Sequence, residues 1–174
     1  IIGLTGSFGS GCTKVSKILE GRGFQRISVS QFLVNEANKR SINVDSLPRQ
    51  ERRKILQDIG NQLRENDAGF LIKEAIKLAN LDKNVVIESI KNPGEIKELK
   101  KVPNSYVIAL DTSFEKRKDR ILRKEYDGDS KLFERDDKRE RDEGIKNGQK
   151  LQECVDLADI LINNDKDRHT PQED

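Results

Sequence analysis

The chain has 174 residues, of which 33% are hydrophobic and 37% charged, so we expect a single domain with a densely ionic surface. Its 33 lysines and arginines nearly balance its 31 aspartates and glutamates, which leaves a formal net charge of +2. This balance argues against a general nucleic-acid binder, which would carry a one-sided basic excess. No apolar run reaches the roughly 18–20 residues of a membrane helix, so we expect no membrane partner.

The cysteine usage indicates a reducing compartment. Cys12 lies in a glycine-rich loop and Cys154 on the apolar face of an expected helix, and this pair does not suggest a disulfide framework. We also expect no secretory leader before the first strand. We therefore predict a cytoplasmic location.

Apolar runs alternate with amphipathic stretches along the chain. The apolar runs predict strands at residues 1–5, 24–28, 84–89, 105–111 and 159–163. Stretches with helical spacing predict helices at 13–21, 31–40, 48–66, 69–80, 93–101, 113–143 and 151–158, with Val15, Ile18 and Leu19 as the apolar face of the first helix. Strands separated by helices predict an α/β fold, a three-layer sandwich with a five-stranded parallel sheet between helices.

The stretch GLTGSFGSGCTK, residues 3–14, predicts a phosphate-binding loop. Its glycines allow a tight turn that directs backbone N–H groups at an anion, and the following helix directs its positive end at the same place. The Thr13 hydroxyl is placed to bind Mg²⁺. We expect a nucleoside triphosphate such as ATP, with Mg²⁺, at the predicted phosphate-binding residues Gly6, Ser7, Phe8, Gly9, Ser10, Gly11, Cys12 and Thr13.

Cys12 departs from the pattern G-x-x-x-x-G-K-[ST], in which a lysine precedes the final residue. A neutral thiol cannot follow the negative charge that develops on the transferring phosphate. Lys14 lies about 200° further round the helix, so it is not a simple substitute. Two functions stay open: a working kinase, or a nucleotide-binding sensor domain that has lost catalysis. A separate alternative for Cys12 itself is a redox-sensitive thiol whose pKa is lowered by the helix N-terminus.

Further polar residues follow the central strands. Glu88 to Lys91 come at the end of the expected third strand, and Asp111 at the end of the fourth. Because the carboxyl ends of parallel strands meet at one edge of a sheet, we expect these residues to lie near the glycine-rich loop.

On these residues the chain resembles the P-loop nucleoside monophosphate kinase superfamily. GLTGSFGSG and GQKLQECVDLADILINN (148–164) are similar to segments of dephospho-coenzyme A kinases, and RRKILQDIGNQLREN (52–66) to a helix of deoxynucleoside monophosphate kinases. The loop form GSGCT resembles kinase-like domains fused to deoxycytidylate deaminases, although the sequence lacks the H-x-E and P-C-x-x-C zinc signature. The resemblance implies phosphoryl transfer from ATP to a (deoxy)nucleoside monophosphate or similar acceptor.

The resemblance also implies a domain organisation. Residues 1–165 would form the kinase-like domain, with a helical acceptor-binding insertion at about 29–80 and a charged lid at about 124–146. Residues 166–174 would be a polar tail, either a linker or a frayed end. Nucleotides are the expected partners; the sequence leaves open a homodimer and an associated deaminase-type domain.

Residue roles follow from the same resemblance. Glu88 would hold Mg²⁺ through water or orient the acceptor, the alternative being a salt-bridged structural carboxylate. Arg64, Gln57 and Lys91 would bind the acceptor. Arg120 and Arg123 would clamp the transferring phosphates and supply part of the charge missing at Cys12. A solvated, self-paired helix surface is the alternative for all of these basic residues.

Overall fold

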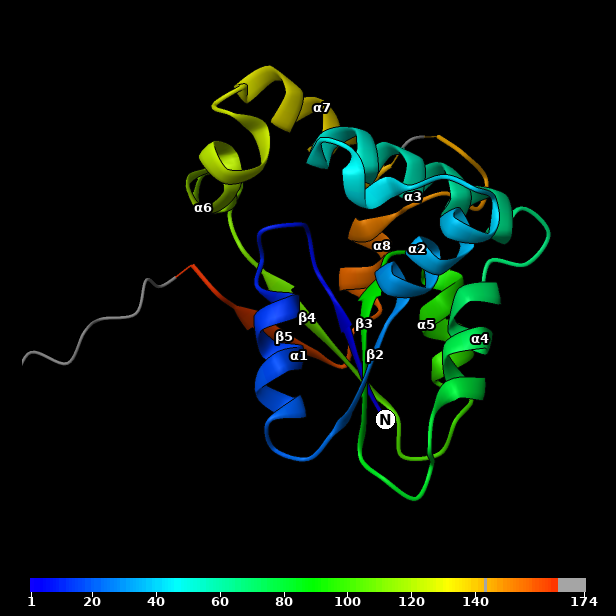
Figure 1. Ribbon diagram of the computed structural model, residues 1–174. Helices are drawn as coiled ribbons and strands as arrows, with labels where there is room; N and C mark the ends of the chain where they lie inside the picture. The colour runs from blue at the N-terminus through cyan, green and yellow to red at the C-terminus, as the bar shows by residue number, and fades with distance from the viewer. Residues whose placement is uncertain (143, 166–174) are drawn as a thin grey trace, which may run out of the picture.

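Apolar and β-branched runs form the five strands of a parallel sheet, as predicted. The computed structural model describes residues 1–142 and 144–165. The strands lie in the order β2-β3-β1-β4-β5 (Figure 1). Their bounds are β1 (Ile2–Thr5), β2 (Gln25–Ser28), β3 (Val85–Ile90), β4 (Tyr106–Asp111) and β5 (Ile160–Asn163). The expected α/β fold class is confirmed, and the predicted tail at 166–174 lies outside the described residues.

The helices follow the amphipathic stretches closely. They are α1 (Cys12–Glu20), α2 (Val29–Lys39), the short 3₁₀ turn η1 (Val44–Ser46), α3 (Arg49–Arg64), α4 (Phe70–Leu78), α5 (Pro93–Leu99), α6 (Phe114–Tyr126), α7 (Ser130–Arg141) and α8 (Leu151–Asp156). The predicted charged helical region at 113–143 is divided between α6 and α7, because Asp127 and Gly128 adopt left-handed backbone conformations there. None of the helices in the described ranges combines the length and apolar character needed to cross a membrane.

Helices cover both faces of the sheet. On one face α1 packs against β1, β2 and β3, and on the other α4, α5 and α8 lie side by side (Figure 1). The expected apolar face of α1 is only partly buried, since Ile18 keeps 44% of its surface exposed. The fully buried residue of α1 is instead Ser16, which hydrogen-bonds the buried carboxylate of Glu88. The side of α1 that faces the sheet is therefore centred on Ser16 and its bond to Glu88, and not on the expected apolar face.

Two helices, α6 and α7, stand over the carboxyl ends of the strands beside α3 (Figure 1). An aromatic cluster joins them to the loop after β1, because the ring of Phe8 packs on those of Tyr126 and Phe133 at centroid distances of 6.1 and 5.2 Å. The buried guanidinium of Arg117 adds bonds to the Phe8 carbonyl and to Asp137. The two helices therefore form a lid, α6–α7, that is docked on the loop.

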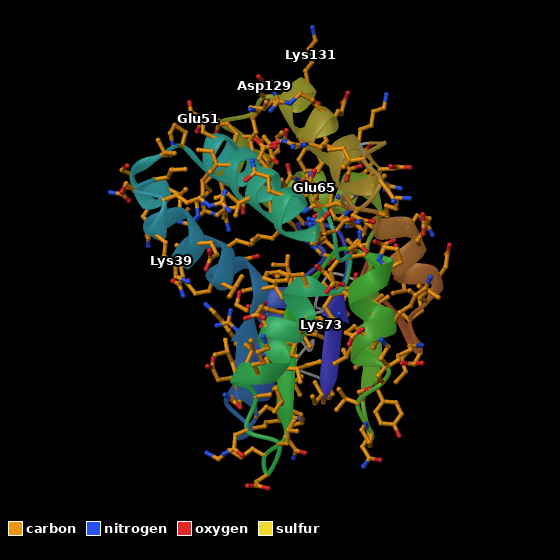
Figure 2. All side chains as sticks on the ribbon, turned by 90° about the vertical axis from the view of Figure 1, so that its right-hand side faces the viewer. Lys39, Glu51, Glu65, Lys73, Asp129 and Lys131 are labelled. Atoms are coloured by element: carbon orange, nitrogen blue, oxygen red, sulfur yellow. The ribbon has the colours of Figure 1, made fainter. Side chains whose placement is uncertain are left out.

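The dense charge of the sequence lies mostly on the outer surfaces of the helices. Figure 2 shows Lys131 extending from the outer end of the lid, and Lys39 and Glu51 on the outer side of α2 and α3. Many of these charges pair within one helix, as Lys39 does with Glu36 at 2.5 Å. Such exposed pairs contribute little stability each, so the buried charges described below matter more.

Candidate phosphoryl-transfer site

The predicted phosphate-binding loop is present between β1 and α1. Gly9 (φ 81°) and Gly11 (φ 107°) adopt left-handed conformations that favour glycine. The Ser10 carbonyl accepts bonds from Asn164 Nδ2 at 2.7 Å and from Thr112 Oγ1 at 3.3 Å. The ends of β4 and β5 therefore hold the loop in shape, and α1 begins directly behind it at Cys12.

Two adjoining cavities meet at this loop. The smaller, of about 370 Å³, is lined by most of the loop from Gly6 to Thr13. The larger, of about 540 Å³, lies between the loop, α2 and α3. Both are lined by Thr13, Ser30, Arg53, Ser89, Lys91, Glu125 and Glu140. Because they share these residues, molecules bound in the two cavities would lie next to each other.

One face of α3 supplies four arginines to the larger cavity, each of them ion-paired with a carboxylate. These arginines are Arg49, Arg52, Arg53 and Arg64. Gln57 lies on the same face and donates to Gln149 Oε1 at 2.9 Å. The predicted residues Arg64 and Gln57 are therefore brought together here. The other three arginines were missed, although their spacing of three and four residues already indicates one helical face.

Arg64 is almost completely buried and held rigidly. Its Nε donates to Glu95 Oε1 at 2.7 Å, and its NH1 would come within 3.2 Å of a Cβ at Gly60. The other oxygen of Glu95 accepts from the backbone N–H groups of Lys91 and Asn92, which begins α5 with a capping box. Arg64 is thus connected through the Glu95 carboxylate to the turn that carries Lys91.

Lys91 lies at the phosphate-binding loop. Its ammonium donates to the Gly6 carbonyl and to Glu140 Oε1, both at 2.5 Å. The sequence predicts an acceptor-binding role, and Lys91 does line the larger cavity, but its contacts are with the loop and the lid. A local bulge explains this, since the pairing of β1 with β3 shifts register between Gly3 and Thr5.

Glu140, on α7, was not singled out by the sequence. Its carboxylate accepts from the Phe8 backbone N–H at 3.0 Å as well as from Lys91. It is nearly buried and lines both cavities. The Glu140 carboxylate therefore accepts a hydrogen bond from a loop amide, that of Phe8, which the glycine pattern predicts to bind phosphate.

Glu88 is held by partners on α1 and β2. It is buried, accepts from Ser16 Oγ at 2.8 Å and is ion-paired with Arg26, and it is not among the residues that line either cavity. Its ion pair with Arg26 matches one alternative that the sequence left open, a salt-bridged carboxylate at a strand end. The expected role of Glu88, to hold Mg²⁺ through water or to orient the acceptor, stays a prediction. The carboxylate joins α1 to β2 and β3 because a buried charge needs a paired cation.

The basic stripe of α6 is divided by the fold. Arg120 donates to the Gly9 carbonyl at 3.3 Å and to the Asn164 carbonyl at 2.6 Å, so it supports the loop from outside. Arg123 is exposed and lines neither cavity. These two side chains therefore do not form the expected phosphate clamp in this arrangement, because neither of them lies on the face of α6 that lines a cavity.

Cys12 is a neutral thiol in this environment. Burial raises its pKa above the ordinary range, and the nearby Lys91 and the bond with Ser10 Oγ oppose that effect only in part. The raised pKa argues against the alternative of a redox-sensitive Cys12 with a lowered pKa, because burial disfavours the charged thiolate.

Thr13 is exposed and lines both cavities. No group of three or more acidic, histidine or cysteine side chains suited to a metal is found among the described residues. The Thr13 hydroxyl lies where the two cavities meet, and its expected role as a Mg²⁺ ligand stays a prediction.

Similar sequences come from archaeal proteins of one family. A UPF0200 protein of Methanoregula boonei is 32% identical over 173 residues, and one of Pyrococcus abyssi is 31% identical over 172 residues. In both cases the alignment covers 95% of this chain and 87% of the relative. The chain belongs to the UPF0200 family. No protein-family model matches this UPF0200 sequence.

Solved structures show which fold this UPF0200 chain shares. It resembles TT1252 from Thermus thermophilus with a TM-score of 0.59 at 15% identity, covering 95% of this chain and 88% of that one. It also resembles shikimate kinase from Acinetobacter baumannii in complex with shikimate, with a TM-score of 0.56 at 16% identity and coverages of 95% and 84%. The fold is that of P-loop kinases. The finer resemblances to deoxynucleotide and dephospho-coenzyme A kinases and to deaminase-fused domains stay predictions.

We predict that Cys12 of this UPF0200 protein reacts slowly with iodoacetamide near neutral pH. The thiolate is the reactive form, and a raised pKa shifts its formation to higher pH than the value of about 8.5 for free cysteine. Peptide mass spectrometry after timed alkylation across a pH series measures the rate at Cys12 and at added glutathione. A Cys12 rate profile that rises at lower pH than that of glutathione would contradict the expectation.

Proposed function

We propose that this protein is a phosphotransferase. It binds a nucleoside triphosphate at the loop from Gly6 to Thr13 and transfers the terminal phosphoryl group to an anionic acceptor in the larger cavity. The observation that carries the proposal is that the two cavities adjoin at Thr13, Ser89 and Lys91. Phosphoryl transfer depends above all on positioning donor and acceptor together and on positive charge around them.

The acceptor is inferred from the lining of the larger cavity. Four arginines and Lys91 face two carboxylates, Glu125 and Glu140. Positive charge stays in excess when Asp45 and Glu95, which pair with Arg52 and Arg64, are added, so the charge favours an anion. A volume of 540 Å³ lies within the range of about 300–1,000 Å³ that is usual for small-molecule sites. No aromatic side chain is among its described lining residues, so recognition rests on charge, on Gln57 with Gln149, and on aliphatic contacts. A (deoxy)nucleoside monophosphate or similar phosphorylated acceptor fits this description.

The proposed step is a direct transfer. The bond from the terminal phosphorus to the bridging oxygen breaks, a bond to an acceptor phosphate oxygen forms, and the nucleoside diphosphate leaves. An acceptor phosphate oxygen is already ionised at neutral pH, so no general base is needed. The Thr13 hydroxyl would hold Mg²⁺, which supplies charge neutralisation for the phosphates. Arg64 and Gln57 would orient the acceptor.

A second function is supported by one observation. Cys12 replaces the usual loop lysine with a neutral thiol, which favours a sensor domain that binds a nucleotide without turnover. Binding alone does not separate the two functions. Turnover does.

The experiment for the proposed function has two stages. Thermal unfolding is first measured with ATP, GTP and their diphosphates, with and without Mg²⁺; a ligand at 100 times its Kd stabilises by about 2.7 kcal/mol. ATP labelled in its terminal phosphate is then incubated with nucleoside monophosphates and dephospho-coenzyme A. Shikimate, bound by the Acinetobacter baumannii neighbour, is added as a non-phosphorylated anion. Binding with transfer supports the kinase, binding without transfer supports the sensor, and no binding rejects both.

We expect Arg52→Ala to weaken the acceptor selectively. Arg52 lines the larger cavity but not the smaller one. Its ion pair with Asp45 joins side chains that are 36% and 61% exposed, so its loss costs the fold little. Losing one charge-assisted hydrogen bond of about 1.5 kcal/mol raises the acceptor KM about tenfold. Arg135→Ala on α7, where the side chain is 62% exposed and lines neither cavity, is the matched control. An equal effect on ATP and acceptor would reject this assignment of the cavities.

We expect Glu140→Gln to strengthen triphosphate binding by about tenfold, since it removes an anion that competes for the Phe8 amide and for Lys91. Titration calorimetry of ATP binding to the wild type and the variant measures the change. Glu134→Gln, an exposed position on the same helix, controls for the general loss of negative charge. Weaker binding in Glu140→Gln would mean that the carboxylate helps to hold the ligand.

A further inference from the structure

We infer that Lys91 supplies, from the end of β3, the positive charge that the loop lacks at position 12. The inference rests on the proposed function and names the residue that replaces the usual lysine in it. Lys91 would contact the outer phosphates of the bound triphosphate directly. It would therefore be a catalytic residue that acts beside a loop whose position 12 is neutral.

The first support is that both side chains converge on Gly6. Cys12 Sγ lies 3.1 Å from the place where a Cβ at Gly6 would be, so the side chain at position 12 is directed at the start of the loop. Lys91 Nζ reaches the carbonyl of the same residue at 2.5 Å. The ammonium of Lys91 and the side chain at position 12 therefore approach the same residue of the loop. The nearness of Lys91 to the Cys12 thiol agrees with this placement, because its charge opposes the rise of the thiol pKa.

The second support is the backbone that brings Lys91 there. Ser89 adopts a left-handed conformation (φ 72°), which is uncommon for a residue with a side chain. It lies at the bulge, after which Thr5 pairs with Ile90 and Thr5 Oγ1 bonds the Ile90 carbonyl at 2.9 Å. Glu95 then fixes the backbone N–H of Lys91 at 2.9 Å. Strained backbone is concentrated at functional sites, and here it turns the strand end toward the loop.

The third support is the lid carboxylate that accompanies the ammonium. Glu140 accepts from Phe8 N–H at 3.0 Å and from Lys91 at 2.5 Å, so one anion bridges a loop amide and this cation. These two donors are of the kind that bind a phosphate oxygen in other P-loops. The carboxylate thus marks an anion position, and a triphosphate would take over both donors as the lid carboxylate withdraws.

Other cations near the loop have acceptors of their own. Arg117, which bonds the Phe8 carbonyl, pairs with Asp137 at 2.6 Å and lines neither cavity. Among the described residues, the basic side chains that line the smaller cavity are Lys91 and Arg53. Arg53 lies over the Phe8 ring at 4.2 Å and pairs with Glu125 at 2.8 Å. Arg120 holds the Gly9 and Asn164 carbonyls from outside, and Lys14 is exposed and lines neither cavity. Lys91 is therefore the cation in contact with the beginning of the loop.

In the transfer step described above, Lys91 would stay protonated throughout. The bond from the terminal phosphorus to the bridging oxygen breaks and the bond to the acceptor oxygen forms, while the ammonium balances the charge that moves to the leaving diphosphate. No proton, electron or further reactant is needed from the side chain. Its loss should therefore cost rate in the same way as the loss of an arginine that contacts the transferring phosphate.

The test moves the charge back to its usual position. Lys91→Met is compared with Lys91→Met/Cys12→Lys and with Lys77→Met, an exposed lysine of α4 that pairs with Glu74. All are measured for unfolding temperature without ligand, for ATP affinity by calorimetry, and for phosphoryl transfer. Because Lys91→Met leaves Glu140 buried without its cation, the same set is also made with Glu140→Gln, which removes that burden on folding.

We expect Lys91→Met to lower the transfer rate by about 10³ and to weaken ATP binding at least tenfold, and Cys12→Lys to restore most of both losses. A Lys91→Met protein that binds and transfers like Lys77→Met overturns the inference while leaving the proposed function intact. A folded double variant without rescue also overturns it, because Lys91 then acts through the fold and not through its charge. No ATP binding by the wild type overturns the inference together with the proposed function.

Discussion

The arrangement of the site depends on one interaction, the ammonium of Lys91 on the Gly6 carbonyl and the Glu140 carboxylate. A buried ammonium loses its hydration, so it persists only where acceptors replace the water. The carbonyl comes from the loop after β1 and the carboxylate from α7, and this one cation therefore joins the sheet, the loop and the lid. Its side chain is 14% exposed and that of Glu140 is 3% exposed, so the pair is screened little by solvent.

Charges of alternating sign continue from this pair into the body of the protein. Arg64 on α3 pairs with Glu95, and Glu95 holds the turn that carries Lys91, which in turn meets Glu140 on the lid. Arg64 in the larger cavity is therefore connected to the loop through buried, directional bonds. The apolar contacts of Phe8 with Tyr126 and Phe133 close the lid over the same loop without using charge. Together these contacts hold the loop and the α6–α7 lid as one unit.

Much of the fold was predictable because the signals are local. Alternation of apolar runs with helical spacing gave the strands and helices within a few residues, and the glycine pattern located the loop. The face of α3 that carries Arg64 and Gln57 also followed from helical spacing. The surroundings of Glu88 and Arg123 were not predictable in this way. Glu88 pairs with Arg26, which comes from a different strand. The exposure of Arg123 depends on which face of α6 is turned toward the cavities.

The sequence by itself determined the fold class, the position of the phosphate-binding loop and the absence of a lysine at position 12, since each is written in neighbouring residues. Only the tertiary structure decided where a compensating charge lies. Lys91 is 79 positions further along the chain than Cys12, and it reaches Gly6 because a bulge in β3 and a left-handed Ser89 turn the strand end inward. Backbone turns of this kind depend on pairing between distant strands, which the order of residues does not show.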